Sequence, residues 1–176
     1  LKKNGGVIEN IKPEKNKIKP SVLVKSNLEQ LKNLNRSSTK KEDNPYEGWS
    51  PLMIASWQGR VELVKALLKK GAKISARDKE GYTALSRAAY QGHTKVVKQL
   101  LKAGASYRGE QGEGKAPLLW ASSKGHKETV RVLLDAGADA NKKNKAGTTP
   151  LLSSLENNAE DAAMLLFNGG ANPNVK

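Results

Sequence analysis

Two histidines, His93 and His126, are the side chains of this 176-residue chain best suited to proton transfer at neutral pH. Each directly follows a glycine, and the two stand 33 residues apart, which is not the spacing of a metal-ligand pair or a catalytic pair. Their matching surroundings instead predict a structural hydrogen bond at the start of a helix. The chain has no cysteine, which excludes disulfides, thiol catalysis and cysteine-bound metals. We therefore expect a protein that is not an enzyme and that needs no metal or cofactor.

Aromatic side chains are the second group whose chemistry is informative. The chain has three tryptophans and four tyrosines, but a single phenylalanine. Exposed tryptophan and tyrosine are preferred anchors of protein interfaces, because each buries a large apolar area when a partner binds. These rings can act together only if the elements that carry them place them on one surface.

The elements follow from a repeat that the glycines mark. One set recurs every 33 residues at Gly48, Gly81, Gly114 and Gly147, and a second set, each followed by alanine, recurs at Gly71, Gly104, Gly137 and Gly170. A third set runs through Gly59, Gly92 and Gly125 and breaks at Asn158. A fixed period of this length predicts a stack of similar units, each unable to bury its apolar face alone.

Each period is predicted to hold two short helices and an exposed turn. In the first, Ser50 can cap a helix that begins at Pro51 and ends at Gly59. A second helix, closed by Gly71, has one apolar face formed by Val61, Val64, Leu67 and Leu68. Residues 75–81 have no helical period and end in turn residues.

Three segments of the sequence resemble a known family: residues 81–85 (GYTAL), 88–93 (AAYQGH) and 133–141 (LLDAGADAN). They resemble the ankyrin repeat, and the similarity extends over about residues 45–174. The resemblance implies an all-α solenoid of four helix-turn-helix repeats with projecting β-turn fingers. In this family, the fingers and the first helices line a concave face that usually binds another protein. The histidine that often follows Thr-Pro-Leu in the family is replaced here by Met53, Ser86, Leu119 and Leu152.

The predicted organisation has six parts. Residues 1–20 form a flexible basic tail, and residues 21–44 hold an N-terminal capping helix, as a degenerate repeat, and a loop. The four repeats span residues 45–77, 78–110, 111–143 and 144–176. The capping helix, near residues 26–35, is predicted from Ser26 and Glu29, which form a capping box, and from leucines at helical spacing. The fourth repeat should be the least regular, because Asn158 and Ala159 replace Gly-His.

The repeat places most aromatic residues on one side. Trp57 and Tyr90 end first helices, whereas Tyr107 and Phe167 take positions expected in the core. Together with nearby basic residues, the rings form the predicted protein-binding site, which comprises Tyr46, Trp49, Trp57, Arg77, Lys79, Tyr82, Arg87, Tyr90, Lys115, Trp120 and Lys124. Two roles stay open for Arg87, whose place in the helix is usually small or apolar: a salt bridge with a partner carboxylate, or an internal contact that caps a neighbouring finger.

The charge of the chain is positive and unevenly distributed. The net charge is +14, of which residues 1–41 carry +8, with 11 Lys and Arg against 3 Asp and Glu. An acidic contact surface on the protein partner would complement this excess. Nucleic acid is the less favoured partner, because lysine far outnumbers arginine, the residue better suited to phosphate and base recognition. No apolar run approaches the roughly 18 residues that a membrane span needs.

The leading hypothesis is a stand-alone, monomeric protein-interaction module that acts by covering its partner. Bacterial members of the resembling family include inhibitors and immunity-type proteins that cover an enzyme's active site, and this is the sharper version of the hypothesis. The alternatives are a scaffold or adaptor, a secreted effector, and an electrostatic binder of nucleic acid or anionic surfaces. Absence of cysteine slightly favours an exported or periplasmic location over a cytoplasmic one.

Overall fold

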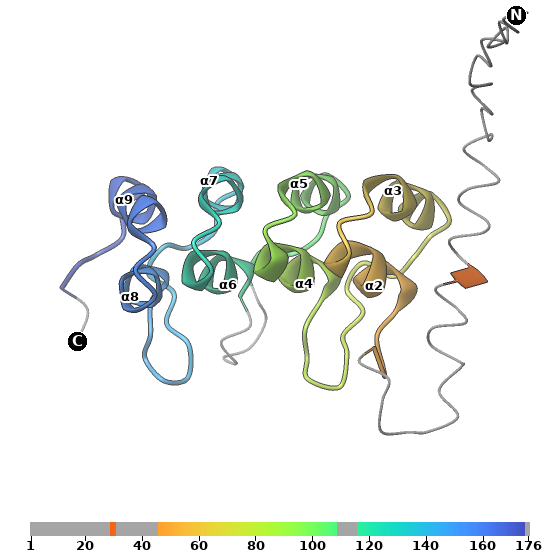
Figure 1. The fold of residues 1–176 in the computed structure, drawn as a ribbon, viewed down its shortest axis with the longest axis horizontal. Coiled ribbons are helices and arrows are strands. Elements are labelled where there is room, and N and C mark those ends of the chain that lie inside the picture. The colour runs from red at the N-terminus through yellow and green to blue at the C-terminus, as the bar shows by residue number, and fades with distance from the viewer. Residues whose placement is uncertain (1–28, 31–45, 109–115, 175–176) are drawn as a thin grey trace, which may run out of the picture.

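The computed structural model describes residues 29–30, 46–108 and 116–174, and this part of the chain is helical apart from turns and loops. Four helix pairs follow one another along the chain: α2 (Pro51–Trp57) with α3 (Val61–Lys69), α4 (Ala84–Gln91) with α5 (Thr94–Lys102), α6 (Pro117–Ser123) with α7 (Lys127–Asp135), and α8 (Pro150–Glu156) with α9 (Glu160–Asn168). The pairs stack side by side in a row (Figure 1). The all-α solenoid predicted from the sequence is confirmed.

Each pair contributes one helix to each of two layers. The first helices, α2, α4, α6 and α8, lie in one layer, and α3, α5, α7 and α9 lie in the other (Figure 1). Within each layer every helix packs against the next. The loop between α3 and α4 and the loop between α7 and α8 project from the layer of first helices (Figure 1), so these two loops and this layer share one side of the molecule.

The helices begin and end where the sequence predicts, for local reasons. Ser50 caps α2 by accepting a hydrogen bond from the amide of Met53 at 3.3 Å, and Pro51 takes the first helical position. Gly92, at the end of α4, has a φ of 73°, a backbone conformation that residues other than glycine rarely adopt. In the fourth pair Asn158 takes the equivalent left-handed conformation, with a φ of 55°.

The projecting loops are closed by tight turns. In the finger between α3 and α4, the amide of Gly81 donates to the carbonyl of Asp78 at 3.0 Å, which is the bond of a β-turn. The carboxylate of Asp78 also accepts from the amide of Tyr82 at 2.9 Å. Asn144 makes the same bond to the amide of Thr148 at 2.8 Å in the finger before α8. The predicted β-turn fingers are therefore present in both loops.

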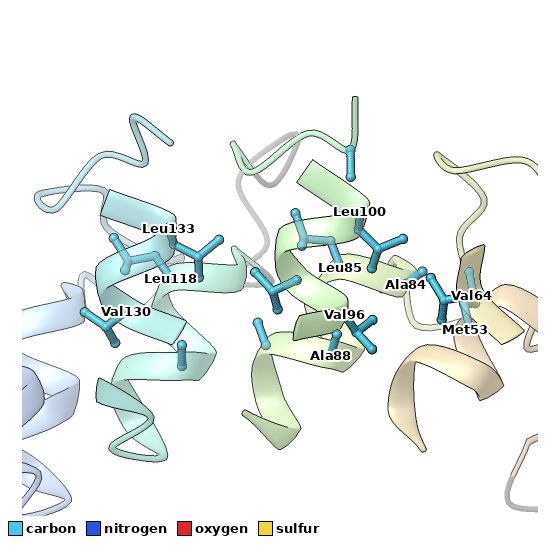
Figure 2. Packing of buried hydrophobic residues seen from close by; sticks show 14 of the residues in the cluster. Met53, Val64, Ala84, Leu85, Ala88, Val96, Leu100, Leu118, Val130 and Leu133 are labelled. Carbon is cyan, nitrogen blue, oxygen red and sulfur yellow. The ribbon is translucent and has the colours of Figure 1, made fainter. Parts of the chain in front are cut away.

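The core lies between the layers and between successive pairs. Leu85, Leu100, Leu118 and Leu133 are fully buried there, and Figure 2 shows these leucines among neighbouring valine and alanine side chains. Burying one such leucine stabilises the fold by about 1.5–3 kcal/mol. Because each pair buries its leucines against a neighbouring pair, the stack is held together by contacts between repeats.

One core prediction is wrong. Phe167 on α9 is 53% exposed, although its equivalents Leu68, Leu101 and Leu134 are half-buried. In the preceding repeats this position lies against the following helix pair, and the described residues after α9, 169–174, form no such pair. Tyr107, the other predicted core ring, is half-buried and packs against the core.

Several predictions lie outside the described residues. They concern the tail at residues 1–20, most of the segment 21–44, and Lys115. Only residues 29 and 30 of the predicted capping helix are described, and both are helical. The repeat boundaries stay a prediction. None of the described helices is long and apolar enough to span a bilayer.

Candidate functional site

Six rings predicted to belong to the site form one continuous chain across three helix pairs. Successive ring centroids lie 5.3 to 5.8 Å apart. Trp57 of α2 and Tyr90 of α4 are stacked, with an interplanar angle of 21°, so the chain crosses from one pair to the next. We call this set the aromatic face; in order along the chain of contacts, it comprises Tyr46, Trp49, Trp57, Tyr90, Trp120 and Tyr82.

The two histidines hold the backbone of this face in place. The Nε2 atom of His93 lies 2.9 Å from the carbonyl oxygen of Trp57, and that of His126 lies 2.9 Å from the carbonyl oxygen of Tyr90. A carbonyl only accepts, so each ring donates from Nε2. The predicted structural role of the histidines is confirmed, and the bonds tie the ends of α2 and α4 to the next helix pair.

Glycine is required where these rings approach the preceding pair. A Cβ built at Gly92 would lie 2.5 Å from Nδ1 of His126, and one built at Gly59 would lie 2.7 Å from Nδ1 of His93. Real Cβ atoms do not come this close to a ring nitrogen. Gly59 and Gly92 therefore serve both a left-handed turn and the close approach of a histidine ring, whereas Gly125, the third glycine of the set, faces Ala159.

Arg87 is held within the protein by two carboxylates of its own finger. Its Nη2 and Nε atoms donate to Oδ2 of Asp78 at 2.5 and 3.1 Å, and Nη2 also donates to Oε2 of Glu80 at 3.0 Å. The side chains of Asp78 and Arg87 are 1% and 13% exposed, so this ion pair is largely shielded from water. Of the two roles open to Arg87, the internal cap of a finger is the one observed.

The same guanidinium also joins the finger to the aromatic face. It lies 3.9 Å from the ring centroid of Trp49 and 4.2 Å from that of Tyr82. These distances are typical of cation–π contacts, which contribute about 0.5–2 kcal/mol. Arg87 therefore positions rings from two successive fingers. Asp78 and Glu80 belong to this site but were not predicted; the turn that leads to Gly81 was the available signal for Asp78.

A hollow opens between the finger and the first helices. Its volume is about 280 Å³. The lining residues are Trp57, Glu80, Tyr82, Ser86, Arg87, Tyr90 and Trp120. This volume lies at the lower limit of pockets that bury a drug-sized ligand, about 300 Å³, and it has room for an inserted side chain.

The remaining basic residues lie at the edges of the site. Lys124 places Nζ 4.8 Å from the ring centroid of Tyr90, whereas Lys79 forms an ion pair with Glu47 at 2.5 Å. Arg77 is exposed on the same finger as Lys79. The structure thus joins Lys124 to the aromatic face but pairs Lys79 with a carboxylate. Within the described ranges, no three His, Asp or Glu side chains converge as metal ligands.

Comparison with known families agrees with this architecture. A family model described as ankyrin repeats, in three copies, matches residues 21–111 and 105–176. The chain belongs to the ankyrin-repeat family. Ankyrin repeats are protein-interaction modules and are generally not enzymes. No curated protein matches the sequence. In this ankyrin-repeat protein, the aromatic face spans the fingers and first helices of three successive helix pairs.

Proposed function

We propose that the aromatic face is the binding site for a protein partner, and that the protein acts by covering the partner's surface. The observation that carries this proposal is the unbroken chain of six half-buried rings across three helix pairs. A purely structural ring would be buried between repeats, yet these rings keep part of their surface in solvent. Tyrosine and tryptophan in such a setting are the usual anchors of interfaces.

The hollow gives the partner a place to insert an anchor of its own. Trp57, Tyr90 and Trp120 line it with apolar surface, and Glu80, with a side chain 67% exposed, supplies an acceptor. The contacts of Arg87 and the histidines fix the surrounding backbone before the partner arrives. Such preorganisation lowers the entropy lost on binding.

The partner's contact surface is proposed to be acidic, because residues 42–176, which include the repeats, carry +6 of the net charge of +14. Part of this positive charge is already paired within the protein. Arg87 and Lys79 are already paired with carboxylates, and Lys124, beside the ring of Tyr90, is the edge cation proposed to meet the partner. Attraction is therefore mostly long-range steering, which raises the association rate more than the lifetime of the complex.

The first test is capture of the partner followed by affinity measurement with variants. Replacing Trp57 or Tyr90 by alanine should weaken binding by about 2 kcal/mol, because each removes an anchor ring. The fold should be retained, which circular dichroism checks. Lys98→Ala, a change on the exposed side of α5, is the matched control and should leave affinity unchanged. Unfolding of the ring variants with unaltered affinity in the folded fraction would make the rings core residues and refute the proposal.

The second test concerns the charge. Raising salt to about 0.5 M should slow association by about tenfold and change dissociation little, since screening acts on the approach of the two proteins. Deleting residues 1–20 should cost less than about 1 kcal/mol of affinity. An association rate that does not respond to salt, or a deletion that abolishes binding, would place the interface elsewhere. Binding to bulk DNA that falls steeply with salt would favour an anionic polymer as the partner.

The sharper form of the proposal is that the partner is an enzyme and that the protein inhibits it by covering its active site. The repeats offer a binding surface, and covering the active site is the direct way in which such a surface can alter an enzyme. Activity of the captured enzyme should fall in a one-to-one titration and return with the Trp57→Ala variant. Full activity in the saturated complex would instead favour a scaffold or adaptor.

A further inference from the structure

The hollow in the aromatic face is bounded by a closed circuit of side chains. Its aromatic part runs from Trp57 through Tyr90 and Trp120 to Tyr82, with successive ring centroids 5.3 to 5.8 Å apart. Arg87 closes the circuit, because its guanidinium carbon lies 4.2 Å from the ring centroid of Tyr82 and 6.0 Å from that of Trp57. All of these side chains line the hollow. A surface of this shape can surround one inserted side chain.

The walls carry charges of both signs, which disfavours a charged guest. Arg87 lies beside the ring of Tyr82, and Nζ of Lys124 lies 4.8 Å from the ring centroid of Tyr90. Cations of the protein itself therefore already occupy the rings to which a lysine or arginine of the partner would bind. A carboxylate of the partner would meet Glu80 and the negative faces of the rings. A neutral side chain with a large apolar part suits these walls better, because no charge has to lose its hydration.

One hydrogen-bond donor and one acceptor remain where Arg87 meets Glu80. Nη2 of Arg87 donates to Oε2 of Glu80 at 3.0 Å, and Nε and Nη2 donate to Oδ2 of Asp78. Among the described residues, no bond uses Nη1 of Arg87 or Oε1 of Glu80. These two atoms belong to groups that the Nη2–Oε2 bond holds together. A hydroxyl both donates and accepts, so one hydroxyl can serve the two atoms.

We propose that the hollow receives a tyrosine side chain of the protein partner, with its ring against the aromatic walls and its hydroxyl bonded to Oε1 of Glu80 and Nη1 of Arg87. This rests on the proposed function, because it names the anchor that the partner inserts into the aromatic face. Tyrosine combines a large ring with a hydroxyl that is neutral at neutral pH. Phenylalanine offers no hydrogen bond, the indole of tryptophan only donates, and serine and threonine have no ring.

Amino-acid analogues test the proposal without the partner. N-acetyl-tyrosine amide and N-acetyl-phenylalanine amide differ by one hydroxyl, and the indole N–H signals in nitrogen-15 NMR of the full chain report their binding. The tyrosine analogue should bind in the millimolar range, and at least about fivefold more tightly than the phenylalanine analogue. The signals of Trp57 and Trp120 should shift more than that of Trp49, which does not line the hollow.

Three results of this titration would overturn the proposal. The first is equal affinity for the tyrosine and phenylalanine analogues. The second is tighter binding of N-acetyl-arginine amide or N-acetyl-glutamate amide, because a charged guest would then be preferred. The third is a larger shift of the Trp49 signal than of the other two, or no shift of any indole signal at about 50 mM of the tyrosine analogue.

Glu80→Ala tests the hydrogen bond from the hydroxyl. The side chain of Glu80 is 67% exposed and Asp78 continues to hold Arg87, so the fold should be retained. The variant should lower the preference for the tyrosine analogue at least about twofold. Glu62→Ala is the matched control, because it removes an exposed carboxylate paired with Lys65 on α3 and should keep the preference. A preference that is unchanged in Glu80→Ala, or equally reduced in both variants, would refute the bond to Glu80.

Competition with the captured partner separates this inference from the proposed function. Displacement of the partner by the tyrosine analogue, but not by the phenylalanine analogue at the same concentration, supports the tyrosine anchor. If Trp57→Ala weakens partner binding but the tyrosine analogue displaces nothing, the anchor is refuted and the proposed function stands. If Trp57→Ala leaves partner affinity unchanged while the hollow still prefers the tyrosine analogue, the proposed function fails and the tyrosine site remains.

Discussion

Removing the guanidinium of Arg87 should destabilise the protein by about 3 kcal/mol. When one member of a buried ion pair is removed, the remaining unpaired charge typically costs 3–5 kcal/mol. Here the Oδ1 atom of Asp78 keeps its bonds from the amides of Glu80 and Tyr82, at 3.0 and 2.9 Å, while Oδ2 loses both bonds from Arg87. The retained amide bonds place Arg87→Ala at the lower end of that range.

A second substitution separates the lost ion pair from lost packing. Asn144 occupies the position of Asp78 in the finger before α8 and makes the same bond to the backbone, so an amide fits this turn. Asp78→Asn in the Arg87→Ala background keeps the turn bond and removes the unpaired charge. The double variant should therefore recover at least about 1.5 kcal/mol relative to Arg87→Ala alone.

The free energy of unfolding of Arg87→Ala and of the double variant is measured by urea unfolding, monitored by far-ultraviolet circular dichroism. A loss of about 3 kcal/mol corresponds to a fall in melting temperature of about 6–12 °C for a protein of this size. The reasoning is refuted if Arg87→Ala costs less than about 1 kcal/mol. It is equally refuted if the double variant is less stable than Arg87→Ala, because the ion pair would then not be the source of the loss.

Three further predictions concern the turns and the histidine bonds. Gly92→Ala should cost at least about 2 kcal/mol more than Gly71→Ala in urea unfolding. Both positions have a positive φ, but a Cβ at Gly92 meets a histidine ring at 2.5 Å and one at Gly71 meets nothing within 4 Å. Equal losses would exclude a steric role for the ring. Asn158→Gly should stabilise the fourth pair by about 0.5–1 kcal/mol, because it relieves a left-handed residue; slower amide exchange in α9 checks this, and faster exchange contradicts it. His93→Ala should lower the free energy of unfolding by about 1–3 kcal/mol, because it leaves the carbonyl of Trp57 without its hydrogen bond. A change below about 0.5 kcal/mol, measured by calorimetry, would show that water replaces the ring without loss of stability.

Features set by short stretches of sequence were predictable. Ser50 and Pro51 determine where α2 begins through their own backbone and side-chain chemistry, and Gly92 ends α4 because of its own φ. The assembly of the rings was also predictable, since a fixed period places Trp57 and Tyr90 at equivalent sites of successive units.

Features that depend on what lies opposite a residue were not predictable. Arg87 had two chemically reasonable partners, and only the 2.5 Å approach to Asp78 decides between them. Phe167 has the sequence surroundings of a core residue, yet its burial depends on a following helix pair. The pairing of Lys79 with Glu47, 32 residues away, depends on how two successive fingers lie against each other.

Because of the aromatic face, tryptophan fluorescence comes from one part of the protein. All three tryptophans lie in one chain of touching rings on the first three helix pairs, and the fourth pair has Phe167 as its only ring. Indole emission therefore reports on the finger side of the first three pairs, with energy exchanged among the three fluorophores. Loss of structure confined to α8 and α9 would leave that emission almost unchanged while reducing the helical dichroism signal. Unfolding curves recorded with the two probes should separate if the fourth pair opens first, and the gap between them would measure its independence from the rest of the stack.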